Sequence, residues 1–117
     1  MSFHSDVTDI EADSISAGSI TIHTKHWLVL VAGETVGLTY IEYLLLKTLM
    51  EERGKVVSRE SLLKRVWSYG NVTLLETRTV DVHVGRLRKK LGEAGELIIT
   101  VRHVGYRMAF SPEWVSR

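Results

Sequence analysis

The clearest hydrophobic pattern in the chain lies between Arg78 and Leu91. Its buried-type residues recur at i, i+4, i+7 and i+11, the spacing of one face of an α-helix: Val80, Val84, Leu87 and Leu91. The pattern predicts a helix over residues 76–91 with one side in the core. The other sides carry five cations and a single carboxylate, Asp81. A solvated helix usually mixes charges for i, i+4 pairing, so this face favours a groove walled by phosphates over surface decoration.

The first half of the chain reads as strands followed by a helix. Short apolar runs between Ser19 and Gly37 predict an antiparallel meander of about three strands, with a tight turn at residues 32–34. Thr39 followed by Glu42 three residues later has the pattern of a capping box. The leucine-rich helix that it begins is predicted to pack in the core and to stop at Gly54.

A second helix and a hairpin flank the basic helix. Ser58 is a suitable N-cap, and the helix after it buries an apolar side: Leu62, Leu63, Val66 and Trp67. Arg59 lies at its start, where free N–H groups and an added cation favour a phosphate contact. Residues 96–102 and 106–110 are β-rich runs around a glycine-containing turn, with Arg102 where the turn begins. A hairpin directly after a basic helix is typical of the wing of a winged helix-turn-helix.

Composition supports a single domain with a strongly polarised charge. The 117 residues carry a net charge of only +1 and no cysteine, which excludes disulfides and cysteine-based zinc sites. Residues 1–52 hold two cations and eight carboxylates, a net charge of −6, whereas residues 53–107 hold twelve cations and five carboxylates, a net charge of +7. The second half is therefore suited to a polyanion. We find no signal peptide and no run long enough to cross a bilayer.

Enzyme chemistry finds little support in the sequence. His23 and His26 are the only close histidine pair, and no third ligand stands near them, so a metal site is disfavoured. No pairing of a nucleophile with a base and no glycine-rich phosphate loop is present. We therefore predict a non-enzymatic protein without a cofactor, a metal or a small-molecule ligand.

Four blocks of the sequence, in order and with matching spacing, carry a resemblance to a known family. They are Leu38-Thr39-x-x-Glu42-Tyr43; Val57-Ser58-Arg59-Glu60-x-Leu62-Leu63-x-x-Val66-Trp67; Arg78-Thr79-Val80-Asp81-Val82-His83-Val84-x-Arg86-Leu87-Arg88-Lys89-Lys90-Leu91; and Thr100-Val101-Arg102-x-Val104-Gly105-Tyr106-Arg107. Over roughly residues 20–110 the chain resembles the DNA-binding effector domain of the OmpR/PhoB family of bacterial response regulators. The resemblance implies an α+β winged helix-turn-helix with a four-stranded N-terminal sheet, a three-helix core and a C-terminal hairpin wing. The extra strand is placed near Ile15.

The resemblance also implies residue roles on DNA. Four residues of the recognition helix would face the major groove: Arg78, Val82, Arg86 and Lys89. Three would approach bases or phosphates from its flanks: His83, Arg88 and Lys90. Five would touch the sugar-phosphate backbone: Arg59, Trp67, Thr79, Thr100 and Tyr106. Arg102 would enter the minor groove. Members of the family bind direct repeats as head-to-tail dimers, and the segment 68–77 lies where relatives contact RNA polymerase.

The sequence departs from the family at several points. We expect no receiver domain in this chain, which would make it either an excised effector domain or a stand-alone regulator. His103 occupies a wing position that is usually glycine, and Gly85 leaves a gap on the outer helix face. We expect residues 1–17 to be a linker or disordered, residues 18–112 to form the domain, and residues 113–117 to be a tail.

Three functions are consistent with these residues. Sequence-specific DNA binding for transcriptional regulation, in the cytoplasm, is the interpretation that the basic helix and the wing favour. The alternatives are a winged-helix module that binds an acidic protein, and the cytoplasmic DNA-binding head of a membrane-bound activator.

Overall fold

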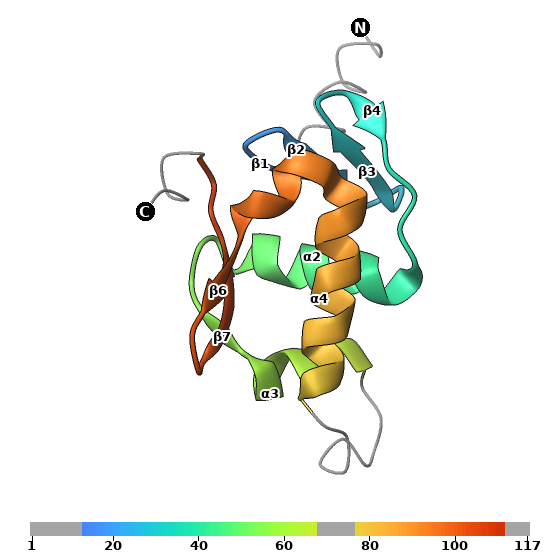
Figure 1. The fold of residues 1–117 in the computed structure, drawn as a ribbon. Coiled ribbons are helices and arrows are strands. Elements are labelled where there is room, and N and C mark those ends of the chain that lie inside the picture. The colour runs from blue at the N-terminus through green and yellow to red at the C-terminus, as the bar shows by residue number, and fades with distance from the viewer. Residues whose placement is uncertain (1–12, 68–76, 112–117) are drawn as a thin grey trace, which may run out of the picture.

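The computed structural model describes residues 13–67 and 77–111. Its N-terminal part is a four-stranded antiparallel sheet with the order β1-β2-β3-β4 (Figure 1). The strands are β1 (Ser14–Ala17), β2 (Ile20–His23), β3 (Leu28–Val31) and β4 (Glu34–Thr35). The strand that the family resemblance placed near Ile15 is thereby confirmed. The predicted linker boundary at residue 17 is wrong for residues 14–17, because β1 pairs with β2 along its length and Ala17 is buried.

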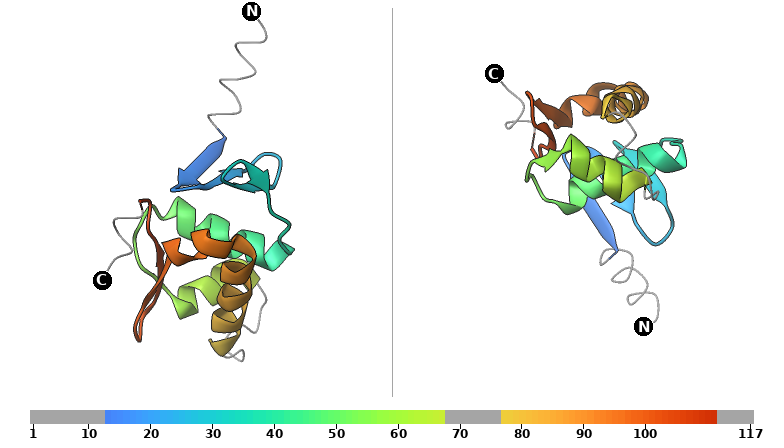
Figure 2. Two further views of the ribbon diagram at one scale, coloured as in Figure 1. Left: turned by 45° about the horizontal axis from the view of Figure 1, so that its top comes forward. Right: turned by 90° about the horizontal axis from the view of Figure 1, so that it is seen from below.

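Helix α2 (Tyr40–Glu51) is the centre of the fold. The predicted capping box is confirmed: the Thr39 hydroxyl accepts a hydrogen bond from the Glu42 amide, and Glu42 Oε1 accepts one from the Thr39 amide. Leu45, Leu46 and Leu49 are fully buried. The helix contacts β1 on one side and α4 (Arg78–Leu91) on the other. Figure 2 shows the N-terminal sheet and the remaining helices on opposite sides of α2.

The second predicted helix begins as expected and then changes geometry. Ser58 caps α3 (Arg59–Leu62) through a hydrogen bond from the Ser61 amide to its hydroxyl. A π-helical turn, Leu63–Trp67, continues it. Leu62, Leu63 and Val66 are buried, as the apolar spacing predicted, whereas Trp67 is half-buried.

Helix α4 ends where the sequence predicted, at Gly92, whose φ is +66°. A 3-10 helix, Gly92–Leu97, follows α4. Gly95 lies within it, and a Cβ added there would stand 2.6 Å from the backbone oxygen of Arg88. The close approach of this segment to α4 therefore requires a glycine.

The predicted hairpin consists of β6 (Ile98–Val101) and β7 (Gly105–Met108). A strand that the sequence did not reveal, β5 (Val57–Ser58), pairs with β7, so the second sheet has the order β5-β7-β6. Gly105 permits this pairing, because a Cβ there would lie 2.0 Å from the carbonyl oxygen of Val57. The hairpin is thus part of a three-stranded sheet, and the third strand, β5, leads directly into α3.

Candidate nucleic-acid interface

The buried side of α4 is the one that the periodicity predicted. Its four apolar residues are at most 3% exposed: Val80, Val84, Leu87 and Leu91. They belong to the same core as the buried leucines of α2, and the two helices are in contact. Because this side is packed, the rotation of α4 is determined, and the opposite side must face solvent.

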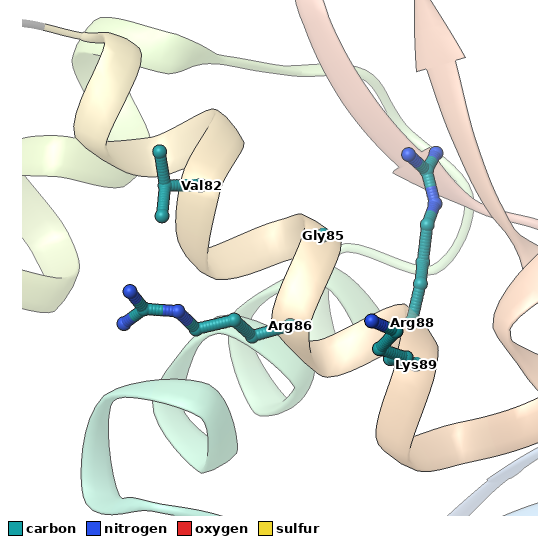
Figure 3. Close-up of a pocket in the computed structure, with 5 residues that line it drawn as sticks. All are labelled: Val82, Gly85, Arg86, Arg88 and Lys89. Carbon is teal, nitrogen blue, oxygen red and sulfur yellow. The ribbon is translucent and has the colours of Figure 1, made fainter.

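The solvent side of α4 carries cations around a small uncharged surface, here called the apolar step, that is formed by Val82 and Gly85. Arg86 and Lys89 are exposed, and neither forms an ion pair or hydrogen bond with any residue in the described part of the chain. Val82 is 45% exposed. A shallow hollow lies among Val82, Gly85, Arg86, Arg88 and Lys89, and Figure 3 shows Arg86 and Arg88 extending to different sides of it. Cations without acidic partners leave this face available to a polyanion.

Asp81, the single carboxylate of α4, joins the helix to α3 and to the hairpin. Its Oδ1 lies 2.8 Å from the Nε of Arg59 and accepts a hydrogen bond from the Tyr106 hydroxyl. Burial alone would raise the pKa of Asp81, but the hydrogen bonds from Tyr106 and Arg59 outweigh it and lower that pKa. The hydrogen bond to Asp81 raises the pKa of Arg59. Asp81 was not among the predicted site residues, although a single carboxylate among five cations of α4 is a signal that the sequence contains.

Tyr106, which was predicted to touch the sugar-phosphate backbone, is buried beside α4. The residue is 3% exposed, and its ring lies between two guanidinium groups, with the Cζ of Arg59 5.3 Å and that of Arg88 5.6 Å from its centroid. Burial raises the pKa of the Tyr106 hydroxyl. The Tyr106 side chain therefore packs against the guanidinium groups of Arg59 and Arg88.

Arg88 connects α4 to the first hairpin strand. Its Nη2 donates to the carbonyl oxygen of Ile98 and to the Thr100 hydroxyl, the latter at 2.9 Å, and its Nε donates to Ile98 at 3.2 Å. The backbone amide of Arg59 donates to the carbonyl oxygen of Val104 at 3.2 Å. Helix α4, the hairpin and the start of α3 thus form one connected unit. Thr100, a predicted backbone contact, is exposed beside it.

Lys90 is directed towards the helical core. Its Nζ lies 2.8 Å from Oε1 of Glu42, which is only 2% exposed. Burial alone would raise the pKa of Glu42, yet the hydrogen bonds from Lys90 and from the Thr39 backbone lower it. The ammonium group that was predicted to approach DNA from the flank is therefore paired with Glu42, although the Lys90 side chain is 40% exposed.

The remaining residues that were predicted to contact DNA lie in two places on the unit formed by α4, the hairpin and the start of α3. The first is the edge where α4 meets Trp67. His83 stacks edge-on against Trp67, with ring centroids 5.2 Å apart, and its Nδ1 lies 2.9 Å from the carbonyl oxygen of Thr79. Arg78 is exposed in the first turn of α4. The second is the turn of the hairpin, where Arg102 is exposed.

The turn of the hairpin keeps a tight geometry despite its histidine. His103 has a φ of +68°, a region that glycine adopts at the lowest cost. The Val104 amide closes the turn by donating to the Val101 carbonyl at 2.9 Å. Replacing the usual glycine by His103 therefore leaves a closed turn, with Arg102 presented next to it.

The described residues contain neither a metal-binding cluster nor a membrane-spanning helix. Residues 13–67 and 77–111 include no group of three or more His, Asp or Glu side chains placed to hold a metal ion. None of the helices in these ranges is long and apolar enough to cross a bilayer. The segment predicted to contact RNA polymerase lies outside the described residues except for Thr77.

Comparison with known proteins identifies what this arrangement resembles. Residues 33–108 match the family described as transcriptional regulatory protein, C terminal. The transcriptional regulatory protein CseB of Streptomyces coelicolor is 44% identical over 94 residues, which are 80% of this chain and 38% of CseB. The chain spans about two-fifths of the length of the relatives it matches.

Solved structures extend the likeness to three dimensions. The DNA-binding domain of Klebsiella pneumoniae RstA, in complex with the RstA box, superposes with a TM-score of 0.70 at 38% identity, covering 82% of this chain and 96% of that one. The response regulator DrrB of Thermotoga maritima, an OmpR/PhoB homologue, gives a TM-score of 0.73 at 29% identity, covering 83% of this chain and 44% of that one.

Proposed function

The chain belongs to the family of C-terminal domains of transcriptional regulatory proteins, of the OmpR/PhoB type of response regulator, and on that premise we propose how it binds DNA. It is a non-enzymatic winged-helix domain that binds double-stranded DNA sequence-specifically to regulate transcription. The observation that carries the proposal is the exposed face of α4, where Arg86 and Lys89 have no acidic partner among the described residues.

In this proposal α4 lies in the major groove. The groove is wide enough for one α-helix, and its floor presents base edges that a side chain can distinguish. Arg86 and Lys89 project from the solvent side of the helix on long side chains that can reach guanine N7 and O6 or a phosphate. Arg78, in the first turn of α4, enters the same groove. The hollow around Gly85 faces the bases between them.

The hairpin would stand over the neighbouring minor groove. Arg102 is at its turn, and an arginine inserted into a narrow A·T-rich minor groove meets a strongly negative potential. Arg88 holds β6 against α4 through the Ile98 carbonyl, so the distance between helix and wing does not depend on DNA. The two reading elements are therefore preorganised.

The edge formed by His83, Trp67 and Thr79 would lie along a sugar-phosphate strand. The Trp67 ring is half-buried and held by His83, which limits its rotamers. Arg59 lies at the first turn of α3, but its guanidinium already bonds Asp81. We assign Arg59 to holding the wing and the recognition helix together, with a phosphate as a second partner.

Proposals about dimerisation, location and protein partners are supported only by the resemblance to the family. We propose head-to-tail pairs on direct repeats about one helical turn apart and a cytoplasmic location. Contact with an RNA polymerase subunit through residues 68–77 is a further proposal, supported by the resemblance alone.

Selection of bound fragments from random duplexes at fixed salt concentration tests the proposal. We expect an enriched direct repeat, because the face of α4 combines base-reading and phosphate-binding side chains. Arg86→Ala is then expected to lose about 1–3 kcal/mol of discrimination against altered base pairs. Lys25→Ala is the matched control: it removes the same charge from the N-terminal sheet, where Lys25 pairs with Asp13. Failure to enrich any sequence would contradict the function, and equal losses of Arg86→Ala on specific and random DNA would reduce Arg86 to a phosphate contact.

An acidic protein partner is the second candidate function, because the same unpaired cations would attract it. Salt weakens both kinds of complex, so a salt titration does not separate them. Protection of a defined direct repeat from cleavage does, because a protein-interaction module has no reason to recognise a base sequence.

A further inference from the structure

The solvent face of α4 has an apolar step at its centre. Val82 and Gly85 are three residues apart and so lie next to each other on the helix surface. Val82 is 45% exposed although it is one of the more apolar side chains of the domain. Together with Arg86, Arg88 and Lys89 these two residues line the hollow seen in Figure 3.

Glycine at position 85 has no explanation within the described part of the protein. Its backbone is not in the left-handed region, and a Cβ added to it would meet nothing within 4 Å. A glycine inside a helix is nevertheless unfavourable compared with alanine. By contrast, Gly95 and Gly105 are both required by close backbone approach. The empty space at Gly85 therefore belongs to the surface that α4 offers to a ligand.

We propose that the step formed by Val82 and Gly85 reads a thymine, with the Val82 methyl groups against the thymine 5-methyl group and Gly85 leaving room for it. This inference rests on the proposed function and specifies one base of its operator. It makes Val82 a specificity-determining residue and gives the gap at Gly85 a role.

The chemistry of the hollow selects thymine over the other bases. In the major groove thymine presents a methyl group, whereas adenine and cytosine present amino donors. None of the five side chains that line the hollow has a hydrogen-bond acceptor, and three are cationic donors. An amino group placed there would be left without a partner and would face positive charge, which costs free energy. Guanine offers acceptors that Arg86 or Lys89 could use, but it offers nothing apolar to Val82.

The experiment uses the duplex obtained by selection and replaces each thymine in turn by deoxyuridine, which removes only the 5-methyl group. We expect one position in each half-site at which this replacement weakens binding of the protein about three- to five-fold, the effect of burying one methyl group. Val82→Ala should bind the thymine duplex less tightly and should no longer distinguish it from the deoxyuridine duplex. Val56→Ala, which truncates another exposed valine away from α4, should keep the full distinction.

Gly85→Ala gives an independent measurement on a variant that folds. Because the added methyl group meets no atom of the described chain, this variant should melt at a higher temperature than the parent. It should also bind the thymine duplex more weakly, since the methyl group occupies the room that thymine needs. A more stable but weaker-binding variant cannot be explained by damage to the fold.

Two results would overturn the inference and leave the DNA-binding function in place. One is a selected operator that tolerates deoxyuridine at every thymine. The other is a Gly85→Ala variant that binds both duplexes as the parent does. If selection enriches no sequence, the proposed function fails first, so the two failures are distinguishable.

Discussion

The substitution Lys90→Met distinguishes the two roles that Lys90 could have, which are a contact with DNA and an ion pair with Glu42. The substitution keeps an unbranched, flexible side chain of similar reach and removes the ammonium group. In the structure this group lies 2.8 Å from Glu42 Oε1, and the Glu42 side chain is 2% exposed. Without Lys90, Glu42 keeps the hydrogen bond from the Thr39 amide at 2.9 Å but loses its only cationic partner in the described chain.

The expected loss of stability follows from this burial. Removing one partner of a fully buried ion pair costs about 3–5 kcal/mol. Lys90 itself is 40% exposed, so solvent already screens part of the interaction, and Glu42 retains one of its hydrogen bonds. We therefore expect Lys90→Met to lower the free energy of unfolding by about 1–3 kcal/mol, the cost of an under-satisfied buried group.

Urea denaturation measures this loss as a lower midpoint with an unchanged slope. Lys89→Met is the matched control: the neighbouring residue is exposed and has no partner among the described residues, so its stability should change by less than about 0.5 kcal/mol. DNA affinity should show the reverse order, with Lys89→Met the weaker binder. Wild-type stability of Lys90→Met together with a loss of DNA affinity would refute the assignment and return Lys90 to the interface.

The same pair predicts a dependence on pH. The folded-state pKa of Glu42 is lowered, with the favourable hydrogen bonds outweighing burial. Its contribution to stability is therefore present above the unfolded-state pKa and is lost as the pH falls through the folded-state pKa. Lys90→Met should accordingly narrow the difference in urea midpoint between neutral and acidic solution, and an unchanged difference would contradict the assigned pairing.

Three further variants probe the unit formed by α4 and the wing. Gly105→Ala should destabilise the protein by about 1–3 kcal/mol in thermal unfolding, because its Cβ would lie 2.0 Å from the Val57 carbonyl oxygen; a stability equal to that of the parent would contradict the tight β5–β7 pairing. Asp81→Asn should reduce the loss of stability on acidification, measured as urea midpoints against pH, since the lowered pKa of Asp81 stabilises the fold above its unfolded-state pKa and that contribution disappears as the pH falls. Arg102→Ala should weaken DNA binding most where the flanking sequence is A·T-rich, and equal losses on all flanks would remove the minor-groove role.

Hydrogen bonds and ion pairs divide five of the charged residues of α4 into two groups. Asp81, Arg88 and Lys90 bind α3, the hairpin and α2, respectively, and so hold the helix in place. Arg86 and Lys89 have no such partners among the described residues and remain available to a ligand. Substitutions in the first group should alter stability as well as affinity, whereas those in the second should alter affinity alone.

Local patterns in the sequence predicted the helices, the hairpin and the buried face of the recognition helix, but not strand β5. The spacing of Val80, Val84 and Leu87 placed the buried side of α4, and the Thr39–Glu42 box placed the start of α2. These features depend on residues within a few positions of each other, because helix periodicity and capping are local. The resemblance to a known family added the strand at Ile15, which no periodicity in four residues could establish.

The partners of the cations were decided only by the tertiary structure. Arg59 and Asp81 are 22 residues apart, and Lys90 and Glu42 are 48 apart. Whether a cation on a helix binds DNA or a neighbouring carboxylate depends on which side chains the packed core brings within 3 Å of it. Helix periodicity places both Lys89 and Lys90 outside the buried stripe. It does not show that only Lys90 has a carboxylate partner among the described residues. The sequence determined that α4 is basic, and the packing of α2, α3 and the hairpin against it determined which of its charges are left for a ligand.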